Sequence, residues 1–276
     1  MIWEKAGDRL SRKKLFLFDI DGTLALGEEL LEGSAELIVY LRQTGRKVFI
    51  TTNNSTRSRE DYADFFATRG LQILPEEILT AGELAVMFCK KYFSEKRIFL
   101  VGTPTLKREM EKAGLSVTEE YEEAVGCVLV TFDTTLCFQK LADASRILGR
   151  REVPFIASNP DLSCPTVFGA VPDCGSICCM LKNATGREAK FLGKPFPDMV
   201  NVCRELAGVT AEDMALVGDR IYTDMACAEN AGIDGILVLS GESDRKAAMN
   251  CGLQIPYVFT DVRALHETLL RFRGNE

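Results

Sequence analysis

The sequence has a single histidine, His266, and none of its ten cysteines forms a CxxC pair. Both shortages disfavour a zinc site, because zinc ligands are usually closely spaced imidazoles and thiolates. The densest group of thiols is Cys174, Cys178 and Cys179. A zinc site at this group is one interpretation, but reduced thiols packed in a protein core are the more frequent use of cysteine in a reducing compartment.

Long hydrophobic runs and positive charge are also scarce. No stretch approaches the roughly 20 apolar residues that a membrane-spanning helix needs, and the opening MIWEKAGDRLSRKK is too charged for a secretory signal. The formal net charge of −7 at pH 7 disfavours nucleic acids and anionic membranes as partners. We therefore expect a cytoplasmic protein that has no membrane or nucleic-acid partner and binds any anionic substrate through local positive charge.

Apolar runs typical of buried strands alternate with helix-like segments along the 276 residues. The helix that follows the first strand is predicted to have Ser34 as its N-cap and to end at Gly45, and the last helix to have Asp261 as its N-cap. Repeated strand–helix units predict an α/β fold with a doubly wound parallel sheet. The predicted strands are 15–18, 47–51, 97–102, 126–133, 153–158, 214–219, 235–240 and 257–261.

The chain is longer than a typical single domain, and its middle part reads as a separate α/β unit. We predict a core domain made of residues 1–83 and 187–276, with a smaller α/β domain, residues 84–186, inserted into it. Within the insert, residues 159–176 are expected to be rich in loops.

Polar and charged side chains follow the ends of several predicted strands. In parallel sheets these ends share one edge, where ligands bind. Grouped carboxylates repel one another unless a cation is present, and oxygen ligands without histidine or cysteine favour Mg²⁺. Each stretch alone is also explained as an ordinary turn or helix start, so the prediction depends on their combination. The set comprises Asp19, Asp21, Thr52, Asn53, Lys194, Asp219 and Asp224.

Four short motifs carry a resemblance to a known family. The stretches DIDGT (19–23), TTNNS (51–55), GKPFPD (193–198) and GDRIYTD (218–224) resemble the four motifs of the haloacid dehalogenase (HAD) superfamily of phosphotransferases. The position of the insert, between the second and third motifs, is similar to that in the NagD/p-nitrophenylphosphatase subfamily, class IIA. The resemblance covers about residues 14–240.

The resemblance implies a Mg²⁺-dependent phosphatase that acts on a small phosphorylated metabolite. Asp19 would be the nucleophile and form an aspartyl-phosphate, while Asp21 would be the general acid and base. The family pattern places Mg²⁺ between the carboxylates of Asp19 and Asp219 and the main-chain carbonyl of Asp21. Asp224 would orient metal-bound water or the lysine.

The resemblance also implies roles for the phosphate-binding groups and the insert. Thr52, the backbone at Asn53, and Lys194 would hold the phosphoryl oxygens. The insert would act as a cap whose loops touch the leaving group, and a homodimer formed through the cap is a further expectation. The cap residues expected to set specificity are Asn159, Asp161, Gly175 and Ser176.

Two alternatives to a phosphatase remain open from the sequence. A phosphomutase on the same core would transfer the phosphoryl group to a sugar rather than to water. A non-catalytic, phosphate-sensing protein would keep the fold without turnover, although all four motifs are intact in this chain.

Overall fold

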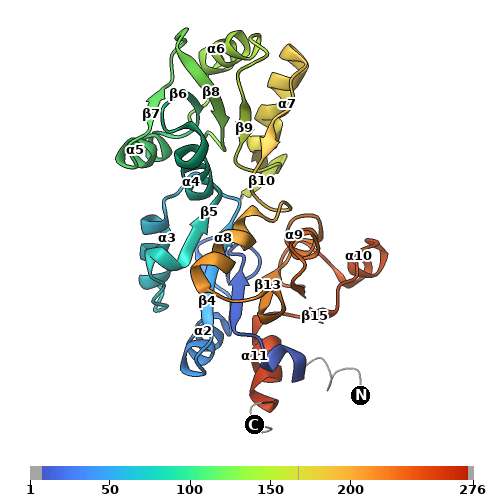
Figure 1. Ribbon diagram of the computed structural model, residues 1–276. Helices are drawn as coiled ribbons and strands as arrows, with labels where there is room; N and C mark the ends of the chain where they lie inside the picture. The colour runs from blue at the N-terminus through green and yellow to red at the C-terminus, as the bar shows by residue number, and fades with distance from the viewer. Residues whose placement is uncertain (1–7, 167, 273–276) are drawn as a thin grey trace. The chain divides into compact units, whose positions relative to one another are not determined.

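The structure, a computed structural model of the protein, describes residues 8–166 and 168–272. The chain divides into two compact units (Figure 1). The first unit takes the described residues up to Thr51, the segment Ala63–Ile78, and those from Lys194 on; the second takes Thr52–Tyr62 and Leu79–Gly193. The chain therefore passes between the units at four places.

A six-stranded sheet forms the centre of the first unit, with β1 flanked by β13 and β4. Both pairings are parallel, as are β13 with β14 and β14 with β15. All four residues of β1 are fully buried, which explains why LFLF has no polar break. In order across the sheet the strands are β15 (Tyr257–Phe259), β14 (Asp234–Val238), β13 (Met214–Gly218), β1 (Leu15–Phe18), β4 (Lys47–Thr52) and β5 (Ile78–Thr80).

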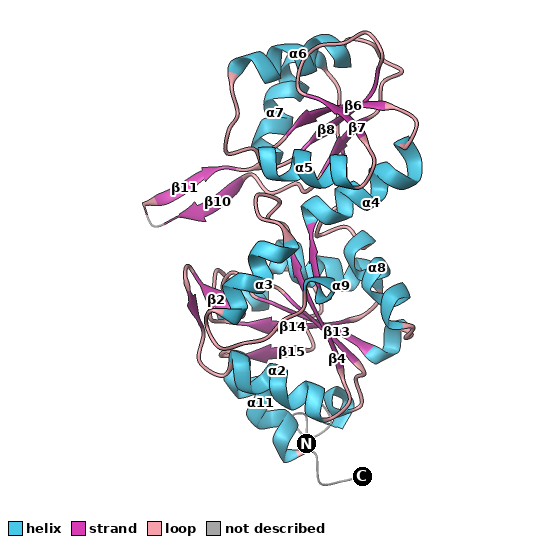
Figure 2. Cartoon of the chain, turned by 90° about the vertical axis from the view of Figure 1, so that its left-hand side faces the viewer, coloured by secondary structure: helices cyan, strands magenta, loops and turns pink. Residues whose placement is uncertain are grey.

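The strand order reverses at β1. From β1 the chain builds outward through β4 on one side and then returns to build outward through β13, β14 and β15 on the other. Helices flank this sheet, as the prediction of a doubly wound fold requires (Figure 2). They include α2 (Ser34–Gln43), α8 (Asp198–Ala207), α9 (Ala226–Ala231), α10 (Arg245–Asn250) and α11 (Val262–Arg271). In such sheets the reversal creates a crevice at the carboxyl ends of β1 and β13, where ligands bind.

One of the two predicted helix caps is confirmed and the other is wrong. Asp261 is the N-cap of α11, where its Oδ1 accepts a hydrogen bond from the N–H of Ala264 at 2.8 Å. Ser34 is instead the first residue of α2, and the N-cap is Gly33 at φ 89°. The Ser34 hydroxyl donates to the carbonyl of Leu24 at 2.9 Å, so a tertiary contact uses the group that a cap would need.

The second unit has a five-stranded parallel sheet in the order β12 (Lys190–Phe191), β9 (Phe155–Ala157), β8 (Val125–Val130), β6 (Arg97–Val101) and β7 (Ser116–Thr118). Four helices accompany it: α4 (Ala81–Phe93), α5 (Pro104–Lys112), α6 (Phe138–Leu148) and α7 (Cys174–Thr185). Cys174 and Cys178 are part of the core between α7 and the sheet, whereas Cys179 is exposed. Packing thus accounts for two of the three clustered thiols.

Several elements of the second unit differ from the sequence prediction. Helix α4 was not foreseen, although Thr80 caps it by accepting from the N–H of Glu83. Part of the expected loop 159–176 forms the hairpin β10 (Ser163–Thr166) and β11 (Gly169–Pro172), which extends away from the sheet of this unit (Figure 2). Both strands are mostly exposed, so they lack the apolar pattern by which strands are recognised.

Helix α3 (Arg59–Ala67) lies between β4 and β5 along the chain. None of the helices in the described ranges 8–166 and 168–272 is long and apolar enough to span a bilayer.

Replacing Leu17 with alanine should reduce the free energy of unfolding by about 2–5 kcal/mol, because Leu17 is 0% exposed in the central strand and truncation leaves a cavity. Urea denaturation measures the change. The control is Val39→Ala on α2, which is 45% exposed and should change stability by less than about 0.5 kcal/mol. Equal losses in the two variants would contradict the assigned core.

Candidate active site

Two aspartates stand directly after the two strands that meet at the reversal of strand order. Asp19 follows β1 and Asp219 follows β13. The ladder continues one step beyond β1, since the N–H of Asp19 donates to the carbonyl of Val217 at 2.9 Å. Both side chains are almost fully buried. The sheet itself therefore brings these two carboxylates to the same edge.

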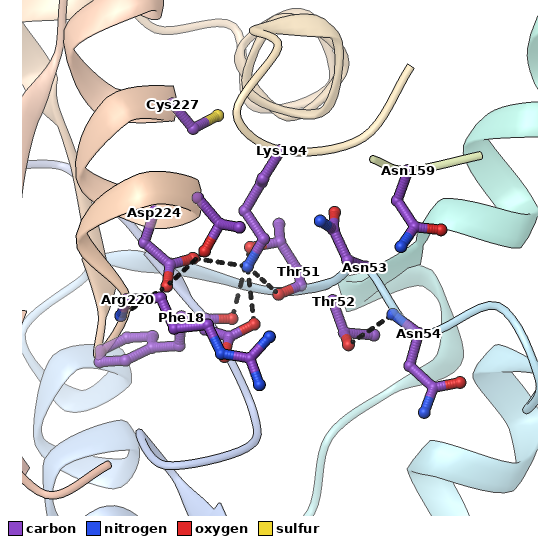
Figure 3. A network of polar contacts seen from close by, with 12 residues as sticks. Phe18, Thr51, Thr52, Asn53, Asn54, Asn159, Lys194, Arg220, Asp224 and Cys227 are labelled. Carbon is purple, nitrogen blue, oxygen red and sulfur yellow. Dashed lines mark hydrogen bonds and ion pairs between the residues drawn. The ribbon is translucent and has the colours of Figure 1, made fainter. Parts of the chain in front are cut away.

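Lys194 links the carboxylates through its ammonium group (Figure 3). Its Nζ donates to Asp19 Oδ1 at 2.6 Å, to Asp224 Oδ1 at 2.7 Å and to the carbonyl of Thr51 at 3.2 Å. The three donors of the ammonium thus have three acceptors, and the side chain is buried. Lys194 thus joins Asp19, which follows β1, Thr51 near the end of β4, and Asp224, which follows β13.

Asp224 lies in a single π-helical turn, Ile221–Met225, that leads into α9. Its Oδ2 accepts from the N–H of Arg220 at 3.1 Å, while Oδ1 faces Lys194. A Cβ atom on Gly218 would lie 2.3 Å from Asp224 Cγ, so only glycine permits this close approach at the end of β13. The glycine of the GD motif therefore makes room for the second aspartate of the same motif.

The three carboxylates outnumber the single ammonium, and burial together with neighbouring carboxylates raises the pKa values of Asp19 and Asp219. Burial raises the pKa of Asp19 to about 8, with Lys194 opposing the rise and Asp224 and Asp219 adding to it. Burial and Asp224 raise the pKa of Asp219 to about 6. Burial alone would lower the pKa of Lys194, but Asp19 and Asp224 raise it, so the lysine stays charged. Ionised together, the four groups carry two excess negative charges, which a divalent cation would balance.

The donor set of this cluster fits a hard divalent cation. One oxygen from each of Asp19, Asp219 and Asp224 lies within 4.8 Å of the others. Asp219 Oδ1 is buried and has no hydrogen-bond partner in the described part of the chain, which leaves it available to a cation. Carboxylate oxygens without nitrogen or sulfur ligands favour Mg²⁺ among the common ions.

Asp21 occupies a different environment from Asp19. It is exposed, and it lies in a tight turn where the N–H of Gly22 donates to the carbonyl of Ala25 at 2.7 Å. Its side chain is not part of the group of carboxylate oxygens formed by Asp19, Asp219 and Asp224. An accessible carboxylate two residues beyond the buried one suits proton transfer to or from a substrate.

Thr52 and Asn53 belong to the second unit, although Thr52 is the last residue of β4. Thr52 Oγ1 accepts from the N–H of Asn54 at 3.1 Å. The amide of Asn53 donates to Asp161 Oδ2 at 2.9 Å, within the same unit. The side chain of Asn53 is thus held by Asp161.

The four residues expected to set specificity lie in the second unit, and three of them are buried. Asn159 donates to Asp161 and Asp173, at 3.3 and 3.4 Å. A Cβ atom on Gly175 would lie 2.2 Å from the carbonyl oxygen of Pro160, so this glycine serves close packing. Ser176 is half-buried as a residue, and its hydroxyl donates to the carbonyl of Leu162 at 2.5 Å.

Two residues near the cluster were not anticipated from the sequence. The N–H of Glu242 donates to Asp219 Oδ2 at 2.7 Å, and Arg220 Nε lies 3.0 Å from Glu242 Oε2. Glu242 follows β14, which is the neighbour of β13 in the sheet. Because parallel strands end at the same edge, this position after the next strand could have predicted that Glu242 lies near Asp219.

Comparison with known proteins places this geometry in a family. Residues 16–116 match the model of haloacid dehalogenase-like hydrolases and residues 191–265 match a second HAD-hydrolase-like model. An acid sugar phosphatase of Staphylococcus haemolyticus is 30% identical over 249 residues, 90% of this chain and 94% of that protein. The structure resembles the 4-nitrophenylphosphatase of Thermotoga maritima, with 36% identity, a TM-score of 0.89, and coverage of 95% of this chain and 99% of that one.

A further solved structure, described as a putative NagD protein, is 36% identical with a TM-score of 0.85, and the match covers 94% of this chain and 98% of that one. The chain therefore belongs to the haloacid dehalogenase-like hydrolases, and within them to the group of NagD-like phosphatases. It is accordingly a hydrolase that acts on phosphate monoesters, as the motifs predicted.

Mg²⁺ should stabilise the protein more at about pH 8 than at about pH 5. The folded-state pKa values of Asp19 and Asp219, about 8 and about 6, exceed the ordinary 3.8. The metal-free folded protein therefore binds more protons than the unfolded chain in the pH range between 3.8 and these raised values. Its free energy of unfolding consequently falls as the pH rises through them. A cation needs the ionised carboxylates, so its effect grows over the same range.

Thermal unfolding in EDTA and in saturating Mg²⁺, at both pH values, measures this difference. Asp219→Asn is the control, because it removes one ligand and should reduce the Mg²⁺-induced rise in Tm at either pH. A rise in Tm that is the same at both pH values would contradict the assignment of these carboxylates as the metal site.

Proposed function

We propose that this protein is a Mg²⁺-dependent phosphatase that hydrolyses a small phosphate monoester through an aspartyl-phosphate on Asp19. The observation that carries the proposal is the cluster of carboxylate oxygens from Asp19, Asp219 and Asp224, together with the Lys194 ammonium that contacts Asp19 and Asp224. This arrangement supplies a nucleophile, a site for a divalent cation and a fixed positive charge. The names of similar proteins, an acid sugar phosphatase and a 4-nitrophenylphosphatase, support the same activity.

In the first step, a carboxylate oxygen of Asp19 attacks phosphorus, and the bond between phosphorus and the leaving oxygen breaks. Asp21, in its protonated form, donates its proton to the leaving alkoxide, which departs as the alcohol. Asp21 is exposed and Asp19 is buried, which fits these separate duties.

In the second step, the ionised Asp21 accepts a proton from a water molecule as that water attacks phosphorus. The bond between phosphorus and Asp19 breaks, which releases inorganic phosphate and regenerates the carboxylate. Asp21 is then protonated again, ready for the next cycle. The same residue thus serves as acid and then as base, so one turnover consumes one water and one ester.

Lys194 would exchange one of its three present acceptors for a phosphoryl oxygen and hold that oxygen during both steps. Thr52 and the backbone at Asn53 would supply neutral donors to the same group. Asp19, Asp219 and the main-chain carbonyl of Asp21 would hold Mg²⁺. The cation, when bound, neutralises charge on the phosphoryl group and so lowers its repulsion with Asp19. A glycerol phosphate phosphatase of Mycobacterium tuberculosis, 26% identical over 94% of this chain, has been solved in complex with magnesium.

The insert, residues 84–186, would act as the cap that excludes bulk water from the reaction. The names of the relatives, which include an acid sugar phosphatase and a 4-nitrophenylphosphatase, favour small sugar and aryl phosphates as the first substrates to test. Phosphate release from a panel of such esters, with Mg²⁺ and with EDTA, tests the proposal. Transfer of the phosphoryl group to a hexose instead of water would support a phosphomutase, and no turnover of any ester would support a phosphate sensor.

Asp19→Asn should lower the rate of p-nitrophenyl phosphate hydrolysis by more than about 1,000-fold, because the amide is a poor nucleophile for phosphorus. Steady-state kinetics with saturating Mg²⁺ measures the loss, and circular dichroism checks that the variant is folded. The matched control is Asp244→Asn, which keeps the N-cap of α10 and should be as active as the parent. Activity of Asp19→Asn near that of the control would remove Asp19 from its role.

Asp21→Asn should affect alkyl phosphates more than aryl phosphates. The nitrophenolate ion leaves readily without a proton, whereas an alkoxide needs one, so loss of the acid matters mainly for the alkyl esters. The ratio of kcat/KM for glycerol phosphate to that for p-nitrophenyl phosphate measures the effect. An unchanged ratio in the variant would argue against general acid catalysis by Asp21.

A further inference from the structure

The loop that follows β14, residues 240–243, contacts Asp219 although it lies outside the four motifs. The backbone of this loop makes two bonds to Asp219. The N–H of Glu242 donates to Asp219 Oδ2 at 2.7 Å, and the N–H of Ser243 donates to the carbonyl of Asp219 at 3.2 Å. The loop therefore holds both the side chain and the main chain of one residue.

Two glycines enclose the same carboxylate oxygen. A Cβ atom on Gly241 would lie 2.0 Å from Asp219 Oδ2, and a Cβ atom on Gly22 would lie 2.5 Å from it. Neither position can carry a side chain unless the carboxylate turns away. Ser240 connects these two backbones, because its hydroxyl donates to the carbonyl of Gly22 at 2.7 Å.

The two oxygens of Asp219 are consequently in different situations. Oδ2 is bonded to the N–H of Glu242 and is enclosed by Gly22 and Gly241. Oδ1 is buried and has no hydrogen-bond partner in the described part of the chain. The carboxylate is thus fixed in one orientation, with a single oxygen left for another ligand.

The side chain of Glu242 also holds the loop in place, through contacts with the residues after β13. Its Oε2 lies 3.0 Å from Arg220 Nε and accepts from the Tyr222 hydroxyl at 3.0 Å. The hydroxyl of Ser243 also accepts from the N–H of Ile221 at 3.3 Å. These contacts tie the loop to the residues that directly follow Asp219.

We propose that Gly241 and the N–H of Glu242 are positioning groups that turn Asp219 so that Oδ1 alone serves as its metal ligand. This inference rests on the proposed function, since it concerns the metal site of that reaction. The absence of a side chain at Gly241 lets the loop backbone lie against Oδ2, and the N–H of Glu242 then occupies that oxygen. Groups that orient a metal ligand commonly change metal affinity by about 10–100-fold when they are altered.

Gly241→Ala tests the proposal through Mg²⁺ binding, measured by isothermal titration calorimetry without substrate. The added methyl group displaces the Asp219 carboxylate, so the Kd for Mg²⁺ should rise about tenfold. Thermal unfolding in EDTA should stay close to that of the parent protein, because a positioning role predicts lost affinity without lost metal-free stability. Hydrolysis of p-nitrophenyl phosphate should recover at high Mg²⁺ concentration.

The matched control is Gly149→Ala in the second unit. This glycine is the C-cap of α6 at φ −58°, and a Cβ atom there would lie 3.2 Å from its nearest neighbour. Its Kd for Mg²⁺ should equal that of the parent. If Gly241→Ala does not fold, the same measurements are made on Ser240→Ala. Loss of the bond to Gly22 should loosen the loop and raise the Kd about threefold.

An unchanged Kd in Gly241→Ala, or in Ser240→Ala if that variant is used, would overturn the proposal. A rise in Kd that Gly149→Ala shows as well would also overturn it. The same holds for a rise in Kd that is accompanied by a lower Tm in EDTA and explained by it. The proposed function fails separately: if the parent protein binds Mg²⁺ but releases no phosphate from any ester, the reaction is wrong, while the comparison of Kd values still decides the role of the loop.

Discussion

The Lys194 ammonium is the group on which the rest of the site depends. It bonds to carboxylates of Asp19 and Asp224 and to the carbonyl of Thr51, and so joins segments that come from three parts of the sequence. Buried carboxylates repel one another and favour their neutral forms, which the raised pKa values of Asp19 and Asp219 express. One lysine balances part of this charge, and a divalent cation would balance the remainder.

The reversal of strand order at β1 explains why these groups meet. Asp19 and Asp219 each follow a buried strand, and the two strands are neighbours in a parallel sheet. The close packing of Gly218 against Asp224, and of Gly22 and Gly241 against Asp219, shows that backbone approach shapes the cluster as much as the carboxylates themselves. A site built in this way combines a rigid base with ligands whose orientation is set by glycine-containing loops.

Much of this arrangement could be predicted from the sequence, for a physical reason. Carboxylates placed directly after fully buried runs, such as Asp19 after LFLF, have a fixed position in a parallel sheet. Contacts between distant loops leave no such pattern, so the role of Glu242 and the hydroxyl bond of Ser34 were not foreseen. The exposed hairpin β10–β11 was missed because its strands have no apolar face to detect.

Covalent trapping on Asp19 tests the central claim most directly. The protein is mixed with a reactive phosphate ester and Mg²⁺, quenched in acid within a single turnover, and digested for mass spectrometry. We expect a phosphoryl group on the peptide that contains Asp19, formed and lost at rates that match turnover. Turnover at a normal rate with that peptide always unmodified, or with the phosphoryl group on another residue, would contradict it.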